Sequence, residues 1–106
     1  MTVKVVIPRT LALRDVDEAV DHYLGAGAEK AALGFVNALE KTYLHIGRQP
    51  AFGSSRDAHT LNLPGLRSWP LARDPYLVFY FELAAYIDVW RVLHGQRDIP
   101  AWMDAP

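Results

Sequence analysis

The chain has 106 residues, of which 51% are hydrophobic and 22% charged, and 11 Lys and Arg against 12 Asp and Glu give a formal charge of −1. This length predicts one domain over residues 1–106 with a single core. The charge balance disfavours an overall basic nucleic-acid binder, although a near-neutral chain can still carry a local basic patch. Because cysteine is absent, disulfide scaffolds, iron–sulfur clusters and thiolate zinc sites are excluded.

The chain shows no targeting or membrane signal. No apolar stretch approaches the roughly 18 residues that suggest a membrane span. Pro8 interrupts the short apolar run near the N-terminus, so a signal peptide is not expected. We therefore expect a cytoplasmic domain without membrane contact.

The N-terminal segment predicts a strand followed by an amphipathic helix. Residues 3–7 place valine and isoleucine at alternate positions, which is typical of a short strand, and Pro8 closes it. Thr10 is predicted to cap the helix. The apolar stripe of this helix comprises Ala12, Val16, Ala19, Val20, Tyr23 and Leu24. The acidic residues from Asp15 to Asp21 are interpreted as a solvated helix face.

A second helix is predicted over residues 28–46. Gly47 follows it as a C-terminal cap in the left-handed conformation, and Pro50 prevents its continuation. The linker Gly25-Ala26-Gly27 is short, so the two helices are expected to pack as an antiparallel hairpin. The buried stripe of the second helix comprises Ala28, Ala32, Phe35, Leu39, Thr42 and Ile46.

The last third of the chain predicts three strands. After a loop over residues 50–64, strand patterns cover residues 66–72, 76–83 and 86–94. The middle strand has apolar residues on both faces, which indicates a central strand covered on both sides. The predicted order is β-α-α-β-β-β, an α+β domain with a helical hairpin on a small antiparallel sheet.

General catalytic and metal-binding motifs are absent from the sequence. The histidines at positions 22, 45, 59 and 94 have no partner at metal-ligand spacing, so neither a metal nor a cofactor is expected. Gly25-Ala26-Gly27 is not a phosphate loop, because no Gly-Lys-Ser/Thr follows it. The serines lack a glycine-framed nucleophile turn.

Several short motifs in a fixed order carry a resemblance to a known family. Gly65-Leu66-Arg67 precedes the middle strand, Val78-Phe79-Tyr80 lies within it, and residues 91–100 read RVLHGQRDIP. Gln49-Pro50-Ala51-Phe52-Gly53 supplies a P-x-x-G motif after the second helix. Together these segments resemble the ParE branch of the RelE/ParE toxins, the toxic halves of bacterial type II toxin–antitoxin modules.

The resemblance implies the same β-α-α-β-β-β fold and two partners. One is a cognate ParD-like antitoxin, whose C-terminal segment wraps the toxin in a hetero-oligomer. The other is DNA gyrase, because ParE-type toxins inhibit gyrase and thereby arrest growth. They are not themselves established enzymes. Two alternatives stay open: a RelE-like toxin that cuts mRNA in the ribosome, and a degenerate member that binds its antitoxin without being toxic.

The distribution of basic residues favours the gyrase inhibitor over the ribonuclease. A metal-independent endoribonuclease needs an acid–base group and cations that stabilise the phosphorane. The candidates for such a role are His94, Arg97 and Arg67. Arg67 is the only basic residue on the two predicted strands over residues 66–72 and 76–83. Arg91 is expected in a salt bridge with a helix carboxylate, and it points away from His94 unless a bulge intervenes. We therefore assign no catalytic residue.

Two interaction surfaces are predicted. The antitoxin segment is expected to cross the helical hairpin, where the candidate contacts are Arg14, Phe35, Leu39, Tyr43, Arg48 and Arg56. The candidate contacts with the target are Arg67, Trp69, Arg97 and Trp102, and the two tryptophans are equally well explained as lids on the core. Direct DNA binding is not expected, because no helix is rich in Lys and Arg.

Overall fold

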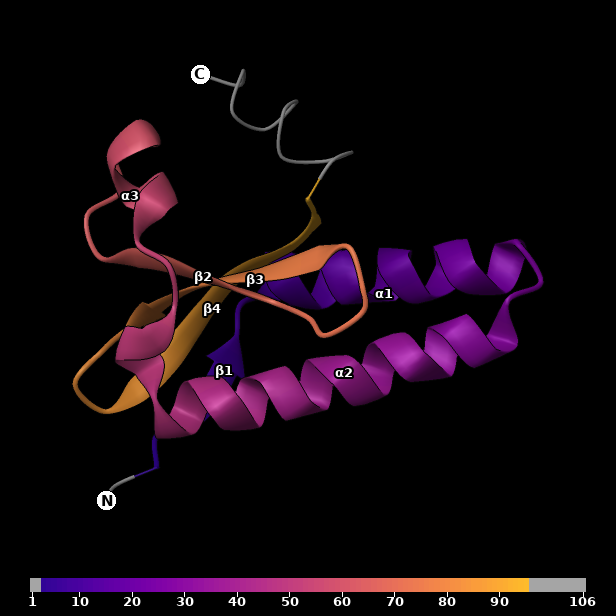
Figure 1. Cartoon of the computed structure of the whole chain (residues 1–106), viewed down its shortest axis with the longest axis horizontal. Helices are drawn as coiled ribbons and strands as arrows, with labels where there is room; N and C mark the ends of the chain where they lie inside the picture. Colours follow the sequence, from indigo (N-terminus) through magenta and orange to yellow (C-terminus); the bar gives the residue numbers. More distant parts are fainter. Residues whose placement is uncertain (1–2, 96–106) are drawn as a thin grey trace.

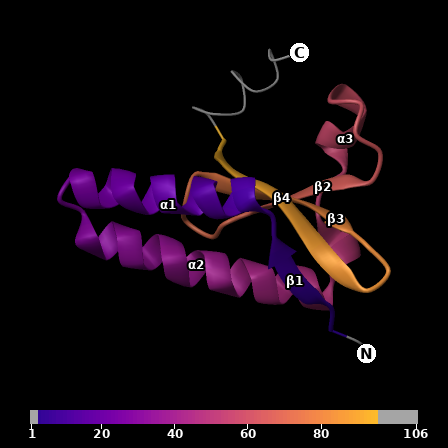
Figure 2. The ribbon, with the colours of Figure 1, turned by 180° about the vertical axis from the view of Figure 1, so that it is seen from behind.

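A helical hairpin lies on one face of a four-stranded sheet (Figures 1 and 2). The structure is a computed structural model that describes residues 3–95. Its elements are β1 (Val5–Pro8), α1 (Thr10–Gly25), α2 (Glu29–Arg48), η1 (Pro50–Phe52), α3 (Arg56–Thr60), β2 (Leu66–Pro70), β3 (Tyr76–Glu82) and β4 (Tyr86–His94). The predicted α+β fold and its element order are confirmed, and the loop after α2 contains two additional short helices.

The sheet is mixed rather than antiparallel throughout. Its strand order is β1-β4-β3-β2, so the first strand of the chain pairs with the last. β1 runs parallel to β4, whereas the other two pairs are antiparallel. The expected all-antiparallel sheet is wrong in this detail because β1 leads into α1 and not into a hairpin turn, so no turn dictates its direction.

Both faces of the central strands are buried, as the apolar pattern of β3 predicts. On the helix face, the core combines residues of α1, α2, β3 and β4, among them Ala12, Phe35, Ile46, Tyr80 and Val89. The opposite face carries a smaller cluster of Leu66, Phe79 and Leu93, against which residues of α3 and the following loop pack. The predicted buried stripe of α2 is confirmed from Ala32 to Ile46.

The ends of the helices differ from the prediction at two positions. Gly47 lies inside α2 and is buried, so it is not a left-handed cap. Its role is close approach: a Cβ there would lie 2.7 Å from the Lys4 carbonyl oxygen, and the Lys4 N–H donates to the Gly47 carbonyl at 3.0 Å. Thr10 is the first residue of α1, while Arg9 occupies the N-cap position without a side-chain cap.

Candidate functional site

Asp15 and Arg91 fasten α1 to β4 through a largely buried ion pair. Arg91 Nε donates to Asp15 Oδ2 at 2.8 Å, and the second guanidinium nitrogen donates to Oδ1 at 2.9 Å. The Val92 N–H also donates to Oδ2, at 3.0 Å, next to a bulge where β4 has one residue more than β3 between paired positions. The expected pairing of Arg91 with a helix carboxylate is confirmed. Asp15 itself is buried, which corrects its interpretation as part of a solvated face.

His94 lies at the end of β4 in a small polar cluster with Tyr76, Asp74 and Tyr23. The rings of His94 and Tyr76 meet edge to face at 78°, with centroids 5.3 Å apart, and the Tyr23 hydroxyl donates to Asp74 at 3.3 Å. Burial raises the pKa of the Asp74 carboxyl, while the Tyr76 N–H, the Tyr23 hydroxyl and the charge of His94 act in the opposite direction.

The three candidate ribonuclease residues are not gathered into one site by the described part of the chain. Arg67 pairs with Tyr80 across the sheet, whereas His94 pairs with Tyr76. These two positions of β3 are four residues apart, which corresponds to roughly 13 Å along the strand. Arg97 lies outside the described residues, as does Trp102, the target-contact candidate.

The P-x-x-G segment is held against the sheet by Tyr80. The Tyr80 hydroxyl donates to the Pro50 carbonyl at 2.7 Å, and Arg67 donates to the Gly53 carbonyl at 2.8 Å. A Cβ at Gly53 would overlap the Tyr80 hydroxyl oxygen, so only glycine fits at this distance. Burial raises the pKa of Tyr80 to about 12. This segment presents Phe52 to solvent, where 72% of the residue is exposed.

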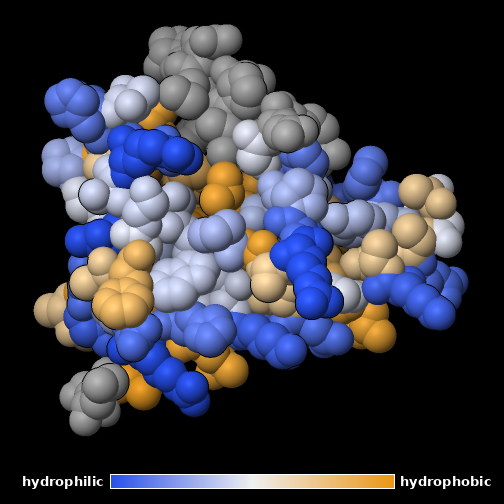
Figure 3. Space-filling model, viewed as in Figure 1, coloured by the Kyte–Doolittle hydropathy of each residue, from blue (hydrophilic) through white to orange (hydrophobic). Residues whose placement is uncertain are grey.

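A groove of about 500 Å³ runs between β1 and α2, and we call it the β1–α2 groove. It is lined mainly by apolar groups: Val3, Val5, Val6, Tyr43 and Leu44, with Lys4, Glu40 and Gly47. Val3, Val5 and Leu44 are each more than half exposed. Apolar side chains are visible along the lower border of the molecule in Figure 3, where α2 lies.

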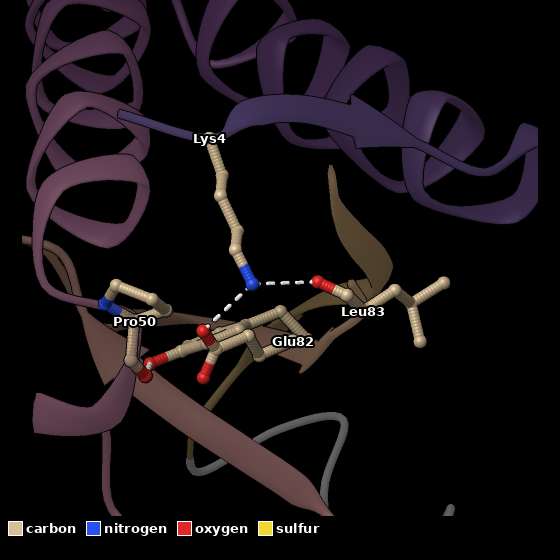
Figure 4. A network of polar contacts seen from close by, with 5 residues as sticks. Lys4, Pro50, Glu82 and Leu83 are labelled. Atoms are coloured by element: carbon tan, nitrogen blue, oxygen red, sulfur yellow. Dashed lines mark hydrogen bonds and ion pairs between the residues drawn. The ribbon is translucent and has the colours of Figure 1, made fainter. Parts of the chain in front are cut away.

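Polar contacts at both ends of β1 fix the position of this strand. Lys4 Nζ donates to the Glu82 carboxylate at 2.9 Å and to the Leu83 carbonyl at 2.7 Å (Figure 4). At the other end of the strand, the Arg9 guanidinium binds both carboxylate oxygens of Asp88. β1 is therefore held at both ends, although Val5 and the preceding Val3 face solvent.

The predicted antitoxin contacts are only partly accessible. Phe35 and Leu39 are buried in the core under the hairpin, at 0% and 6% exposure, which corrects their placement in a docking surface. Tyr43 lines the β1–α2 groove, and burial raises its pKa to about 12. The arginines of this set, Arg14, Arg48 and Arg56, are exposed on α1, α2 and α3. Sequence reasoning missed the valines of β1 as lining of the groove. Their alternation predicts a strand, but it does not show which face of that strand is buried.

Trp69, a predicted target contact, covers the core at the edge of β2. Its ring is parallel to that of His45 on α2, with an angle of 1° between the planes and 6.0 Å between centroids. It packs against the main core as a partly buried residue. One side of the ring therefore packs against the helix, and its role as a target contact stays a prediction.

Within residues 3–95, no group of three or more potential ligand residues is placed to hold a metal ion. No helix of the same range is long and apolar enough to cross a membrane. This part of the surface presents the apolar β1–α2 groove and the exposed arginines Arg14, Arg48 and Arg56. Exposed apolar surface of this kind is common at protein–protein interaction sites.

Comparison with known proteins identifies the family. A family model described as "ParE toxin of type II toxin-antitoxin system, parDE" matches residues 6–99, so the chain belongs to the ParE toxin family. A solved structure described as "Chromosomal ParDE TA system from P. aeruginosa" has the same fold, with a TM-score of 0.73 and 20% sequence identity. The match covers 89% of this chain and 98% of that chain. A sequence search of curated proteins gives no match.

Proposed function

We propose that this chain is a toxin that inhibits DNA gyrase in the bacterial cytoplasm and is neutralised by a cognate antitoxin. Membership of the ParE family supports a toxin of a type II module. The similar fold of a chain from a ParDE system supports a ParD-like antitoxin as partner. Inhibition of gyrase, with growth arrest as its consequence, follows from the resemblance of the sequence to ParE-type toxins.

The observation that favours gyrase over mRNA as the target is that the two arginines on the strands of the sheet are both bound by other groups of the protein. Arg67 donates to a backbone carbonyl and Arg91 is bound by Asp15, so both guanidinium groups serve the fold. β3 carries no basic residue, and His94 lies at the other end of that strand from Arg67. A ribonuclease needs cations directed at one phosphate, and this arrangement supports a toxin that acts by protein contact.

The gyrase proposal is tested with purified gyrase and relaxed plasmid. Added toxin should reduce supercoiling and increase cleaved complexes, and prior incubation with the antitoxin should restore supercoiling. Unchanged supercoiling together with cleavage of mRNA in translating ribosomes would refute the proposal in favour of the RelE-like alternative. Normal growth during expression without an antitoxin would identify a member that binds its antitoxin without being toxic.

We place the antitoxin on the β1–α2 groove. The groove is apolar and open, its rim residues Val5 and Leu44 are 66% and 55% exposed, and β1 is an edge strand of the sheet. An apolar segment that folds on binding recognises such a surface as a helix in the groove or as an added strand. The occupant is therefore expected to be the C-terminal segment of the antitoxin.

Charge substitutions in the groove test this placement. Val5→Glu and Leu44→Glu put a carboxylate into the proposed interface, so each should weaken antitoxin binding by about ten-fold or more in calorimetry. Leu24→Glu is the matched control, because Leu24 is 49% exposed at the far end of α1. Equal affinities of all three variants would move the antitoxin to another surface.

A further inference from the structure

The charges of this chain are strongly separated along the sequence. Residues 41–73 contain five Lys and Arg and a single Asp, whereas the rest of the chain contains six Lys and Arg and 11 Asp and Glu. The basic segment comprises the last turns of α2, η1, α3 and β2, which lie at one side of the molecule (Figure 1). Its last cation, Arg73, lies apart from them, beside Tyr23 and Phe35. The near-neutral total therefore conceals a basic region around the edge of the sheet.

An exposed aromatic residue lies in the middle of this basic region. Phe52 is 72% exposed, between Arg48 at the end of α2 and Arg56 at the start of α3. Both arginines are exposed; for Arg56, 80% of the side chain is accessible, and its contact with Asp57 is a long 3.9 Å. We call Arg48, Phe52, Arg56 and Trp69 the β2-edge face.

A hollow of about 450 Å³ lies beside Phe52 on the β2-edge face. Its lining combines apolar groups of Phe52, Pro70 and Leu77 with the hydroxyl-bearing Ser54 and the guanidinium-bearing Arg56. An apolar hollow with a cation at its rim can accept an apolar side chain whose neighbours are acidic.

The edge of β2 is closed to an added strand. Ser54 and Ser68 exchange two backbone hydrogen bonds of 2.9 Å, and Pro70 has no N–H to offer. A partner at this edge must therefore bind through side chains. The backbone on both sides of Phe52 is fixed by hydrogen bonds, since Tyr80 donates to the Pro50 carbonyl and Arg67 donates to the Gly53 carbonyl. A rigidly presented aromatic residue loses little entropy on binding.

We propose that the β2-edge face is the surface through which the toxin contacts its protein target. Phe52 enters an apolar socket of the target, and acidic target residues around that socket pair with Arg48 and Arg56. This inference rests on the proposed function, because it takes the target to be gyrase. It assigns Arg48 and Arg56 to the target and leaves the antitoxin on the β1–α2 groove.

The composition of this face favours a protein over DNA. Strong DNA binding uses about six to ten phosphate contacts, whereas this face presents two exposed arginines around an apolar residue. An aromatic residue with neighbouring arginines is the usual composition of the centre of a protein–protein interface.

The test uses Phe52→Ala and Arg56→Glu in the full-length chain, both at exposed positions where folding should be unaffected. The matched controls are Leu33→Ala, at a residue 63% exposed, and Lys30→Glu, both near the start of α2. Potency in the gyrase assay should fall by about ten-fold or more for the two test variants. The controls should retain the potency of the unmodified chain, and antitoxin affinity should stay within roughly two-fold in all four variants.

Three results would overturn the proposal. The first is undiminished gyrase inhibition by both test variants. The second is a loss of antitoxin affinity in these variants comparable to their loss of potency, which would assign the face to the antitoxin. The third is binding of the unmodified toxin to a DNA duplex without gyrase that Arg56→Glu abolishes.

Growth arrest on expression separates this inference from the gyrase proposal. If the unmodified chain arrests growth without affecting gyrase, the gyrase proposal is wrong, and the face is then judged by growth alone. Phe52→Ala and Arg56→Glu should still relieve the arrest in that case, while Leu33→Ala and Lys30→Glu should not. Growth arrest by all four variants would refute the face for any target.

Discussion

Replacing Gly53 by alanine should destabilise the protein through one contact, the packing of the P-x-x-G segment on Tyr80. Gly53 has φ −61° and ψ 150°, which alanine adopts without strain, so backbone preference alone would favour the variant slightly. The new Cβ, however, would overlap the Tyr80 hydroxyl and lie 2.8 Å from Cζ of a ring with 0% exposure. Displacing this ring also breaks its hydrogen bond to the Pro50 carbonyl.

The expected loss combines overpacking with a broken hydrogen bond, about 2–3 kcal/mol in the free energy of unfolding. Denaturant titration should measure it directly, and the melting temperature should fall by roughly 10 °C. Gly34→Ala is the control: nothing lies within 4 Å of a Cβ there, so this exposed position in α2 should gain stability or stay unchanged.

A double-mutant cycle tests the assigned cause. Tyr80→Phe removes the overlapping hydroxyl, so Gly53→Ala should cost less in that background than in the unmodified chain, by about 1 kcal/mol. Additive losses in the double variant would refute the role of the hydroxyl. A Gly53→Ala variant as stable as the unmodified chain would refute the packing argument altogether.

Three further substitutions test other contacts. Gly47→Ala should lower the free energy of unfolding by about 1–3 kcal/mol, because its Cβ would meet the Lys4 carbonyl at 2.7 Å; an unchanged thermal melt would contradict this close approach. Asp15→Asn should cost about 2–4 kcal/mol in denaturant titration, whereas the exposed Asp17→Asn should be neutral; equal effects would contradict the buried ion pair. The pKa of Asp74 is raised by burial, so the folded state favours the protonated carboxyl, and stability falls as pH rises from the ordinary pKa of 3.8 through the raised value. Asp74→Asn should therefore increase the melting temperature at neutral pH, and this gain should disappear as the pH falls to 3.8; a gain independent of pH would contradict this linkage.

The order of elements could be predicted because each pattern reports on one element at a time. The helical stripe from Ala32 to Ile46 and the two apolar faces of β3 indicate which residues are buried. The direction of β1 could not be predicted, since it depends on a pairing with β4 that no local pattern encodes. For the same reason Gly47 resembles a helix cap in sequence, although its lack of a side chain allows the backbone at Lys4, just before β1, to approach α2 closely.

The candidate interaction surfaces were less predictable, because an apolar stripe on a helix shows which residues face the core and not which residues contact a partner protein. Phe35 and Leu39 stand out in the sequence because they fill the space under the hairpin, and that burial removes them from any docking surface. Tyr43 lies at the margin of the same stripe and lines the β1–α2 groove. The signal for Phe52 in the sequence is its place in the one long stretch that is poor in acidic residues.

The pairing of β1 with β4 has a consequence for synthesis of the protein. Val5 pairs with Tyr86, so the parallel contact joins residues about 80 positions apart, and β4 is also the strand that β3 needs as a neighbour. Such long-range contacts slow folding, because a large loop must close before they form. While the ribosome still holds the segment that becomes β4, α1 and α2 have no completed sheet to cover. A chain arranged in this way completes its folded surfaces only after β4 has been synthesised.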